Sequence, residues 1–224
     1  MPANCWVNAM ESRILMNLLT FALGILASGI AAVIYDQMTR ARLRISIDGS
    51  GRVRAQMHGL HEFHHLVVHN QRVISIWPFP GRRPAWSAKA HIEVFDAHNK
   101  PVIQDPVYAR WTSQPEPLIP VVSGGAAMNL LDPAKLITGR KVDVHSHEGQ
   151  QISLLIKFQG EDQCHIFSNE SYPHPRWQNP AWRIPLGTFK VRATVFYERG
   201  REIANFKLVN SGPNLDDVQL TVWS

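Results

Sequence analysis

Histidine is the residue type whose number and spacing most suggest chemistry in this chain. The 224 residues include 11 histidines, and two of them, His145 and His147, stand two positions apart. Alternate side chains of a β-strand point to the same face, so a strand here would place both imidazoles side by side. Such a pair can ligate zinc, iron or manganese. The pair is therefore the candidate site for a transition metal, which a metal-dependent enzyme or small-molecule sensor would use.

The surroundings of this pair resemble part of the metal-binding motifs of cupin barrels. Gly139 lies six residues before His145, as in the first cupin motif. Gln151 stands where that motif has a ligating glutamate. His165 and Asn169 match the end of the second motif but lack its Pro-x-Gly lead. The resemblance implies a metal site, and the chain departs from it at one of the ligands.

A second group of histidines lies earlier in the chain. His61, Glu62 and His65 match the His-Glu-x-x-His pattern of zinc proteases, which requires a helix to bring the two imidazoles together. Gly59 precedes this pattern and the strand-like Leu66–Val68 follows it, so little room is left for a helix. The competing interpretation, which we favour, is a group of histidines in a solvated loop. The members of the group are His58, His61, His64, His65 and His69.

Nucleophilic catalysis has no recognisable motif in the sequence. There is no Gly-x-Ser-x-Gly elbow and no glycine-rich phosphate loop, and Cys164 has no motif that links it to a base. The acidic residues are scattered, and their ordinary role is in turns and on solvated faces. The sequence therefore favours a protein without catalytic activity, and leaves the metal-dependent enzyme as the alternative.

Three segments rich in tryptophan, arginine and proline are candidates for partner binding. Tryptophan and arginine are enriched at the energetic centres of protein interfaces, and proline lowers the entropy lost when a loop is ordered. The competing interpretation is that these tryptophans fill the open ends of a β-sandwich. The candidate residues are Trp77, Phe79, Arg82, Arg83, Arg110, Trp111, Arg176 and Trp177.

The elements that must position these residues are β-strands. Apolar and polar residues alternate with a period of two from Leu43–Ile47 to the end of the chain, most clearly over Gly187–Tyr197. Asp48–Gly51 predicts a turn, after which Arg52–Arg54 would return as the arm of a hairpin. The run from Leu186 to Leu220 resembles the last strands of immunoglobulin-like modules. We therefore expect a mainly β fold, an antiparallel two-sheet sandwich of the immunoglobulin-like kind.

One transmembrane helix is expected before this domain. Residues 14–35 are apolar and without a charged side chain, and as a helix they would extend about 33 Å, enough to cross a bilayer once. The alternative is a cleaved secretory signal, because small residues occur between Ala27 and Ala32. On the first interpretation the chain divides into a short tail over 1–13, the helix, a basic juxtamembrane segment with a hairpin over 36–60, and the sandwich over 61–224.

The charges after the helix predict its orientation. Arg40, Arg42 and Arg44 follow it closely, and positive charge resists translocation, so the C-terminal domain is expected in the cytoplasm. The same three arginines would lie within reach of anionic lipid headgroups, although they need only fix the topology. The net charge of +5 has no dense basic stripe interleaved with aromatic residues, so we expect no nucleic acid partner.

Together these patterns predict a single-pass membrane protein with a non-catalytic binding or docking domain. Its partners would be the lipid bilayer and another protein, for instance in a membrane assembly to which it belongs as an accessory subunit. No cofactor is expected on this interpretation, and a transition metal on the alternative one.

Overall fold

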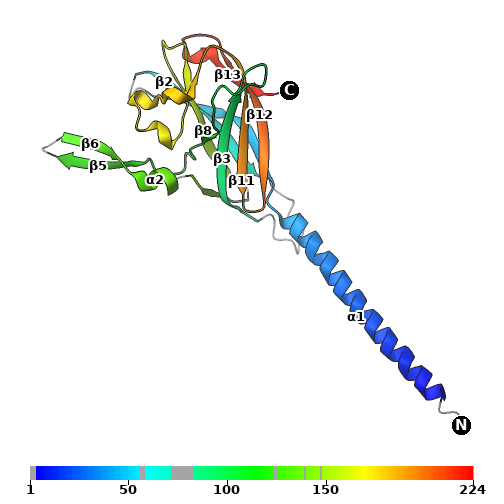
Figure 1. Cartoon of the computed structure of the whole chain (residues 1–224). Coiled ribbons are helices and arrows are strands. Elements are labelled where there is room, and N and C mark those ends of the chain that lie inside the picture. Colours follow the sequence, from blue (N-terminus) through cyan, green and yellow to red (C-terminus); the bar gives the residue numbers. More distant parts are fainter. Residues whose placement is uncertain are drawn as a thin grey trace. The chain divides into compact units, whose positions relative to one another are not determined.

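The structure is a computed structural model that describes residues 4–55, 59–71, 83–123, 126–138, 140–146 and 148–223. Trp77, Phe79, Arg82 and His147 lie outside the described residues, and so do His58 and Gly139. The chain contains a helical unit that ends at Arg40 and a β-rich unit that begins at Ala41 (Figure 1). Each unit is described by itself below.

The described part of the first unit contains the helix α1, Asn4–Thr39. Its segment Met16–Thr39 is long and apolar enough to cross a membrane, and its large apolar side chains from Met16 to Ile34 are all exposed. Two of its hydroxyl groups are satisfied within the helix, since Thr20 Oγ1 donates to Met16 O at 2.8 Å and Ser28 Oγ to Ile25 O at 2.8 Å. The helix thus includes all of the predicted span and continues beyond both of its ends.

The β-rich unit contains two large antiparallel sheets. The first has the order β1-β2-β8-β9-β10, and the second has the order β13-β12-β11-β3-β4 with β7 paired to β3. The strands of the first sheet are β1 (Leu43–Ala55), β2 (His61–Asn70), β8 (Gly149–Phe158), β9 (Cys164–Ile166) and β10 (Arg183–Ile184). Those of the second are β3 (Ala85–Phe95), β4 (Val107–Tyr108), β7 (Val142–Val144), β11 (Gly187–Tyr197), β12 (Gly200–Asn210) and β13 (Val218–Val222).

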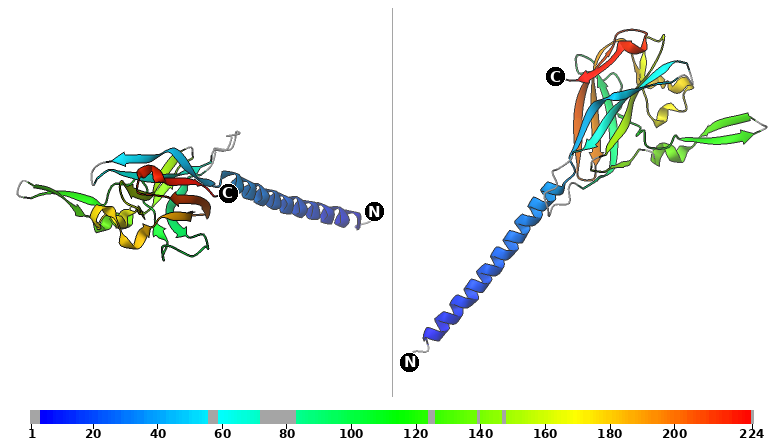
Figure 2. Two further views of the ribbon diagram at one scale, coloured as in Figure 1. Left: turned by 90° about the horizontal axis from the view of Figure 1, so that it is seen from above. Right: turned by 180° about the vertical axis from the view of Figure 1, so that it is seen from behind.

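The smaller elements lie outside these two sheets. The strands β5 (Leu118–Ser123) and β6 (Ala126–Leu131) form a hairpin that extends away from the sheets, and α2 (Pro133–Thr138) follows it (Figures 1 and 2). Four short 3-10 helices complete the unit: η1 (Asn169–Ser171), η2 (Pro175–Trp177), η3 (Pro180–Trp182) and η4 (Leu215–Asp217).

A single hydrophobic core joins the two large sheets. It contains Leu66 and Ile152 from the first sheet and Val191 and Phe206 from the second, all of them at most 1% exposed. The alternation seen in the sequence produces this arrangement, because every second side chain of each strand points into the core. The mainly β, antiparallel fold predicted from the sequence is therefore present, together with the apolar N-terminal helix.

One prediction about the first strand is wrong. Asp48–Gly51 does not reverse the chain, because β1 is one strand that pairs antiparallel with β2 on both sides of that segment. Ile47 is opposite Leu66 and Arg52 is opposite His64, so the extra residues form an irregularity in the register. A bulge of this kind lets a strand contain extra residues while both of its halves stay paired to the same neighbour.

Candidate functional site

A segment with three short 3-10 helices covers the outer face of the first sheet. Lys157 points between the sheets, where its Nζ donates to Asn210 Oδ1 at 3.0 Å. Its neighbours Ile156 and Phe158 therefore point to the opposite face, yet both are fully buried. They are covered by residues 168–182, which contain η1, η2 and η3 and which we call the cap (Figure 1).

Aromatic rings hold the cap on the sheet. The ring of Trp177 lies 5.9 Å from the rings of Phe63 and Phe167, 6.0 Å from Tyr172 and 5.7 Å from His61, measured between centroids. Rings at such distances and inclined angles attract one another beyond the area that they bury. The cap is thus a packed structure, and Trp177 is its central contact with the sheet.

Arg176 and Trp177 have an unusual backbone conformation. Their φ angles are +53° and +58°, in the left-handed region that side chains with a Cβ rarely adopt. This conformation directs Trp177 into the ring cluster, while the guanidinium of Arg176 lies 4.2 Å from the centre of the Phe158 ring. Two adjacent strained residues cost roughly 1–3 kcal/mol each, and such strain is concentrated at functional sites.

Glu161 connects the cap to the turn after β8. Its Oε1 accepts from Arg176 Nη1 at 2.6 Å and its Oε2 accepts from Gln178 Nε2 at 2.5 Å. Both carboxylate oxygens are therefore engaged by two cap residues on either side of Trp177. The ion pair is partly exposed, so its value is mainly to fix the position of the cap.

A polar recess of about 450 Å³ lies beside this ion pair. It is lined by side chains from the turn after β8, from β9 and β10, and from the cap: Glu161, Asp162, Gln163, His165, Gln178 and Arg183. Arg183 lies directly opposite His165 in the pairing of β10 with β9. Among the described residues, no ion pair or hydrogen bond engages the side chains of Arg183 and Asp162. The recess thus presents both a cation and an anion to solvent.

His165 forms the buried wall of the recess. The residue is only 6% exposed, and its Nδ1 has no hydrogen-bond partner among the described residues. Burial lowers its pKa, the nearby carboxylate of Glu161 opposes that shift, and the positive charges of Arg183 and Lys157 add to it. The ring is therefore neutral at physiological pH and can accept or donate one further hydrogen bond.

The predicted partner-binding residues separate into distinct environments. Arg176 and Trp177 lie together in the cap, and Arg83 is exposed at the start of the described segment before β3. Trp111 is fully buried in the core, and Arg110 is 8% exposed with its Nη2 donating to Gln114 O at 2.7 Å. Burial removes these last two side chains from any surface that a partner could contact.

The predicted lipid-binding arginines and the predicted metal-binding histidine also lie in different parts of the structure. Arg42 and Arg44 are exposed, the latter on β1, whereas Arg40 directly follows α1 and its backbone N–H donates to Asp36 O at 2.9 Å. His145 is exposed, and its ring lies 5.9 Å from that of Trp86. In the part of the chain that the structure describes, no three histidine, cysteine or acidic residues come together in a way that could hold a metal ion.

The histidines at residues 61–69 do not lie in a loop, so that prediction is wrong. They belong to β2, where His61, His64 and His65 are buried. On a strand, His61 and His65 are about 13 Å apart along the chain, too far to share one ion as the zinc-protease pattern requires. Instead, His61 Nδ1 lies 2.7 Å from Gly59 O and its ring packs in the aromatic cluster beneath the cap.

Sequence reasoning did not find the recess. Its residues come from a turn, two strands and the cap, which only the fold brings together, and no spacing along the chain connects Glu161 with Arg183. In comparisons with known proteins, no family model, no curated protein and no solved structure matches this chain.

Proposed function

We propose that this chain is a single-pass membrane protein whose β-rich domain is a non-catalytic docking module. The segment Met16–Thr39 supports the anchor, because it is long and apolar and its large apolar side chains from Met16 to Ile34 are exposed. The arginines that follow it support a cytoplasmic position for the domain. The two sheets with one core support an immunoglobulin-like sandwich, which is a fold that presents recognition loops on a rigid framework.

The docking site in this proposal is the cap together with the polar recess. The single observation that carries it is the pair of adjacent left-handed residues, Arg176 and Trp177, held by the ring cluster and by Glu161. A structure so firmly fixed loses little entropy when a partner binds. The exposed Arg183 and Asp162 then offer one charge of each sign, which suits a polar polypeptide segment better than an apolar ligand.

No group in this site supports a catalytic role. The thiol of Cys164 is buried, and burial raises its pKa to about 12, so the reactive thiolate is absent at physiological pH. His165 has no nucleophile beside it among the described residues that line the recess. Recognition is therefore the function that this arrangement supports best, and an accessory subunit of a membrane assembly is the role that we propose.

The proposal is tested by crosslinking the full chain in its native membranes. A photoreactive residue at Gln163, inside the recess, is expected to capture one discrete partner, whereas the same residue at the exposed Asp105 is not. Arg183→Glu should reduce the captured amount at least about tenfold, the effect of a lost charge pair of roughly 1.4 kcal/mol. The matched change Lys100→Glu, at an exposed turn, should leave capture unchanged.

Folding is monitored in the same variants. Because Arg183 is exposed, Arg183→Glu is expected to leave the melting temperature of the protein within about 2 °C of the unsubstituted chain. Equal capture by both charge variants, or capture lost together with the melting transition, would contradict the docking site.

A further inference from the structure

The outer face of the second sheet gathers residues that are scattered along the sequence. On β11, Val191, Ala193 and Val195 are buried in the core, so Lys190 and Arg192 point outward. The register continues this outward row onto both neighbouring strands. Lys190 is opposite Lys207 of β12, and Phe196 is opposite Arg201 of β12 and Lys89 of β3. We call the outward residues of β3, β11, β12 and β13 the basic face.

The basic face holds most of the net positive charge of the chain. Its cations are Lys89, Lys190, Arg192, Arg201 and Lys207. Glu93 is the one carboxylate among the described outward positions of these four strands, and its Oε2 lies 3.6 Å from Arg192 Nη1. The face thus has a net charge of +4, five cations and one anion, where the whole chain has +5.

The nearest carboxylate on the adjoining strand does not offset this charge directly. Asp143 of β7 accepts a hydrogen bond from the backbone N–H of Ser87 at 2.7 Å. That contact holds it at the β7 edge, away from the row of Lys190 and Lys207. The basic face therefore has an excess of positive charge across the two central strands β11 and β12.

Exposed apolar side chains lie between these cations. Phe196 is 38% exposed and Ile203 43% exposed, and Trp223, which directly follows β13, is 40% exposed. The ammonium of Lys190 lies 5.7 Å from the centre of the Trp223 ring, and the guanidinium of Arg192 lies 4.9 Å from that of Phe95. Cations beside tryptophan and aliphatic side chains are typical of protein surfaces that lie at the interface between water and a bilayer.

We propose that the basic face binds the anionic headgroups of the bilayer that holds α1. This inference rests on the membrane anchoring proposed above. The domain begins at Ala41, two residues after the end of α1 at Thr39, so the anchor keeps the face at high local concentration near lipid. Several lysines and arginines on one surface attract the anionic lipids of a cytoplasmic leaflet.

The mixture of cations and exposed apolar side chains on one sheet face favours a bilayer over a nucleic acid strand. Single strands are held in a positively charged groove that follows their backbone. The recess beside the cap and the one along α1 are lined by none of the basic-face residues. A pleated surface of cations and apolar side chains matches a plane of headgroups, where no groove is needed.

The experiment uses the full chain with one fluorescent label. Cys5→Ser and Thr221→Cys place the label beside Lys207 on the basic face, and the remaining Cys164 is buried. The protein is reconstituted into neutral vesicles and into vesicles with about 30% phosphatidylserine, each containing a headgroup quencher. We expect quenching to be at least about threefold greater in the anionic vesicles, and to be lost in about 1 M salt, where the screening length is only about 3 Å.

A matched set of charge changes separates this face from overall charge. The triple variant Lys190→Gln, Arg201→Gln and Lys207→Gln should abolish the additional quenching. A control triple variant, Lys100→Gln, Lys135→Gln and Lys141→Gln, removes the same charge at solvent-accessible positions elsewhere and should retain it. Equal quenching in neutral and anionic vesicles, or equal loss in both triple variants, would overturn the inference.

Two further measurements show whether a negative result concerns the membrane anchor or the basic face. Flotation of the unsubstituted chain with neutral vesicles tests the anchor alone, so its absence would contradict the proposed membrane protein and not specifically the basic face. Tight binding of a single-stranded oligonucleotide that is lost in the basic-face triple variant, without any effect of anionic lipid, would assign the face to nucleic acid and overturn the inference.

Discussion

Two ionisable residues show how far burial sets the chemistry of this domain. Lys157 is fully buried and donates to Asn210 Oδ1 at 3.0 Å and to Gly212 O at 2.8 Å, while burial lowers its pKa. Cys164 is its direct neighbour across β8 and β9, and burial raises the pKa of that thiol to about 12. Lys157 thus serves the structure through hydrogen bonds, and burial keeps the Cys164 thiol protonated.

Acid should destabilise the domain through two buried histidines, His65 and His165, and the partly buried His91. Burial lowers the pKa values of His65, His91 and His165, so these rings stay neutral in the folded chain at a pH where the unfolded chain takes up protons. Stability contributed in this way is complete above the unfolded value of about 6.5 and is lost as the pH falls below it. We therefore expect the melting temperature of the detergent-solubilised protein to fall between pH 7.5 and pH 5.

His165 allows a specific test of this dependence. His165→Gln keeps an amide that can hydrogen bond in the recess and removes the titrating ring, so the variant should lose less stability in acid than the unsubstituted chain. His98→Gln, at an exposed turn, is the matched control. A melting temperature that rises as the pH falls toward 5 would contradict the neutral, buried state of these rings.

At the level of the elements, one short segment links the two sheets. Ala109 N–H donates to Ala90 O of β3 at 2.9 Å, and two residues further on Trp111 bridges to Ile152 of β8. Ser153 N–H donates to Arg110 O at 2.8 Å. The segment after β4 therefore passes from the second sheet to the first, and the Trp111 side chain is fully buried in the core where it crosses.

Removal of this side chain should be costly. Trp111→Ala leaves a large cavity between the sheets, and we expect it to lower the free energy of unfolding by about 3–5 kcal/mol. Trp86→Ala removes a ring that is 44% exposed and should cost much less, on the order of 1 kcal/mol. Denaturant unfolding, followed by circular dichroism, measures both. Similar losses in the two variants would contradict the placement of Trp111.

The sequence predicted the positions of the strands along the chain better than it predicted which strands pair with each other. The alternation over residues 187–197 is a local pattern, so β11 was found with its buried and exposed sides. Its pairing with β3 and β12 depends on contacts between distant segments, and so the basic face could not be seen in the linear order of charges. Trp111 is predicted as a binding residue but is buried, because a segment rich in tryptophan, arginine and proline is typical of an interface and of a core equally.

The cap shows a second limit of sequence reasoning. Its tryptophan, arginine and proline content was recognised, and Arg176 and Trp177 do lie together at the surface. Their positive φ angles could not be predicted, because nothing in Pro-Arg-Trp favours the left-handed region. That conformation depends on the rings beneath and on Glu161, which stands 15 residues earlier.

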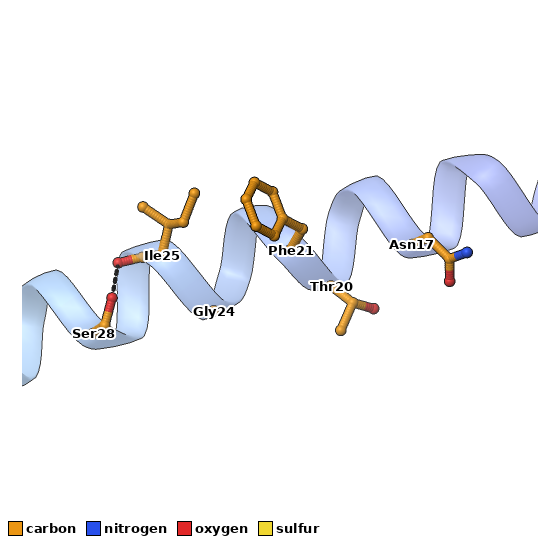
Figure 3. A pocket seen from close by; sticks show the side chains of 6 residues that line it. All are labelled: Asn17, Thr20, Phe21, Gly24, Ile25 and Ser28. Atoms are coloured by element: carbon orange, nitrogen blue, oxygen red, sulfur yellow. Dashed lines mark hydrogen bonds between the residues drawn. The ribbon is translucent and has the colours of Figure 1, made fainter.

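On the scale of the whole molecule, the chain joins an apolar helix to a β-rich domain with charged surfaces. The helix α1 carries few polar groups over Met16–Thr39. Thr20 Oγ1 donates to Met16 O, and Ser28 Oγ donates to Ile25 O (Figure 3 shows the latter bond). Such internal satisfaction is what a lipid environment demands. The domain has its own core and two distinct polar surfaces, the recess beside the cap and the basic face. In our proposal, anchoring gives both surfaces a common function, recognition at a membrane.

The proposed membrane protein requires that the apolar helix remains in the chain and holds it in a bilayer. The most direct measurement is alkaline carbonate extraction of the native membranes, followed by the intact mass and N-terminal sequence of the recovered protein. We expect the protein to remain in the membrane fraction after carbonate treatment and still to contain residues 16–39. A soluble chain that begins near Ala31 or Ala32 would contradict it, because the helix would then be a removed secretory signal.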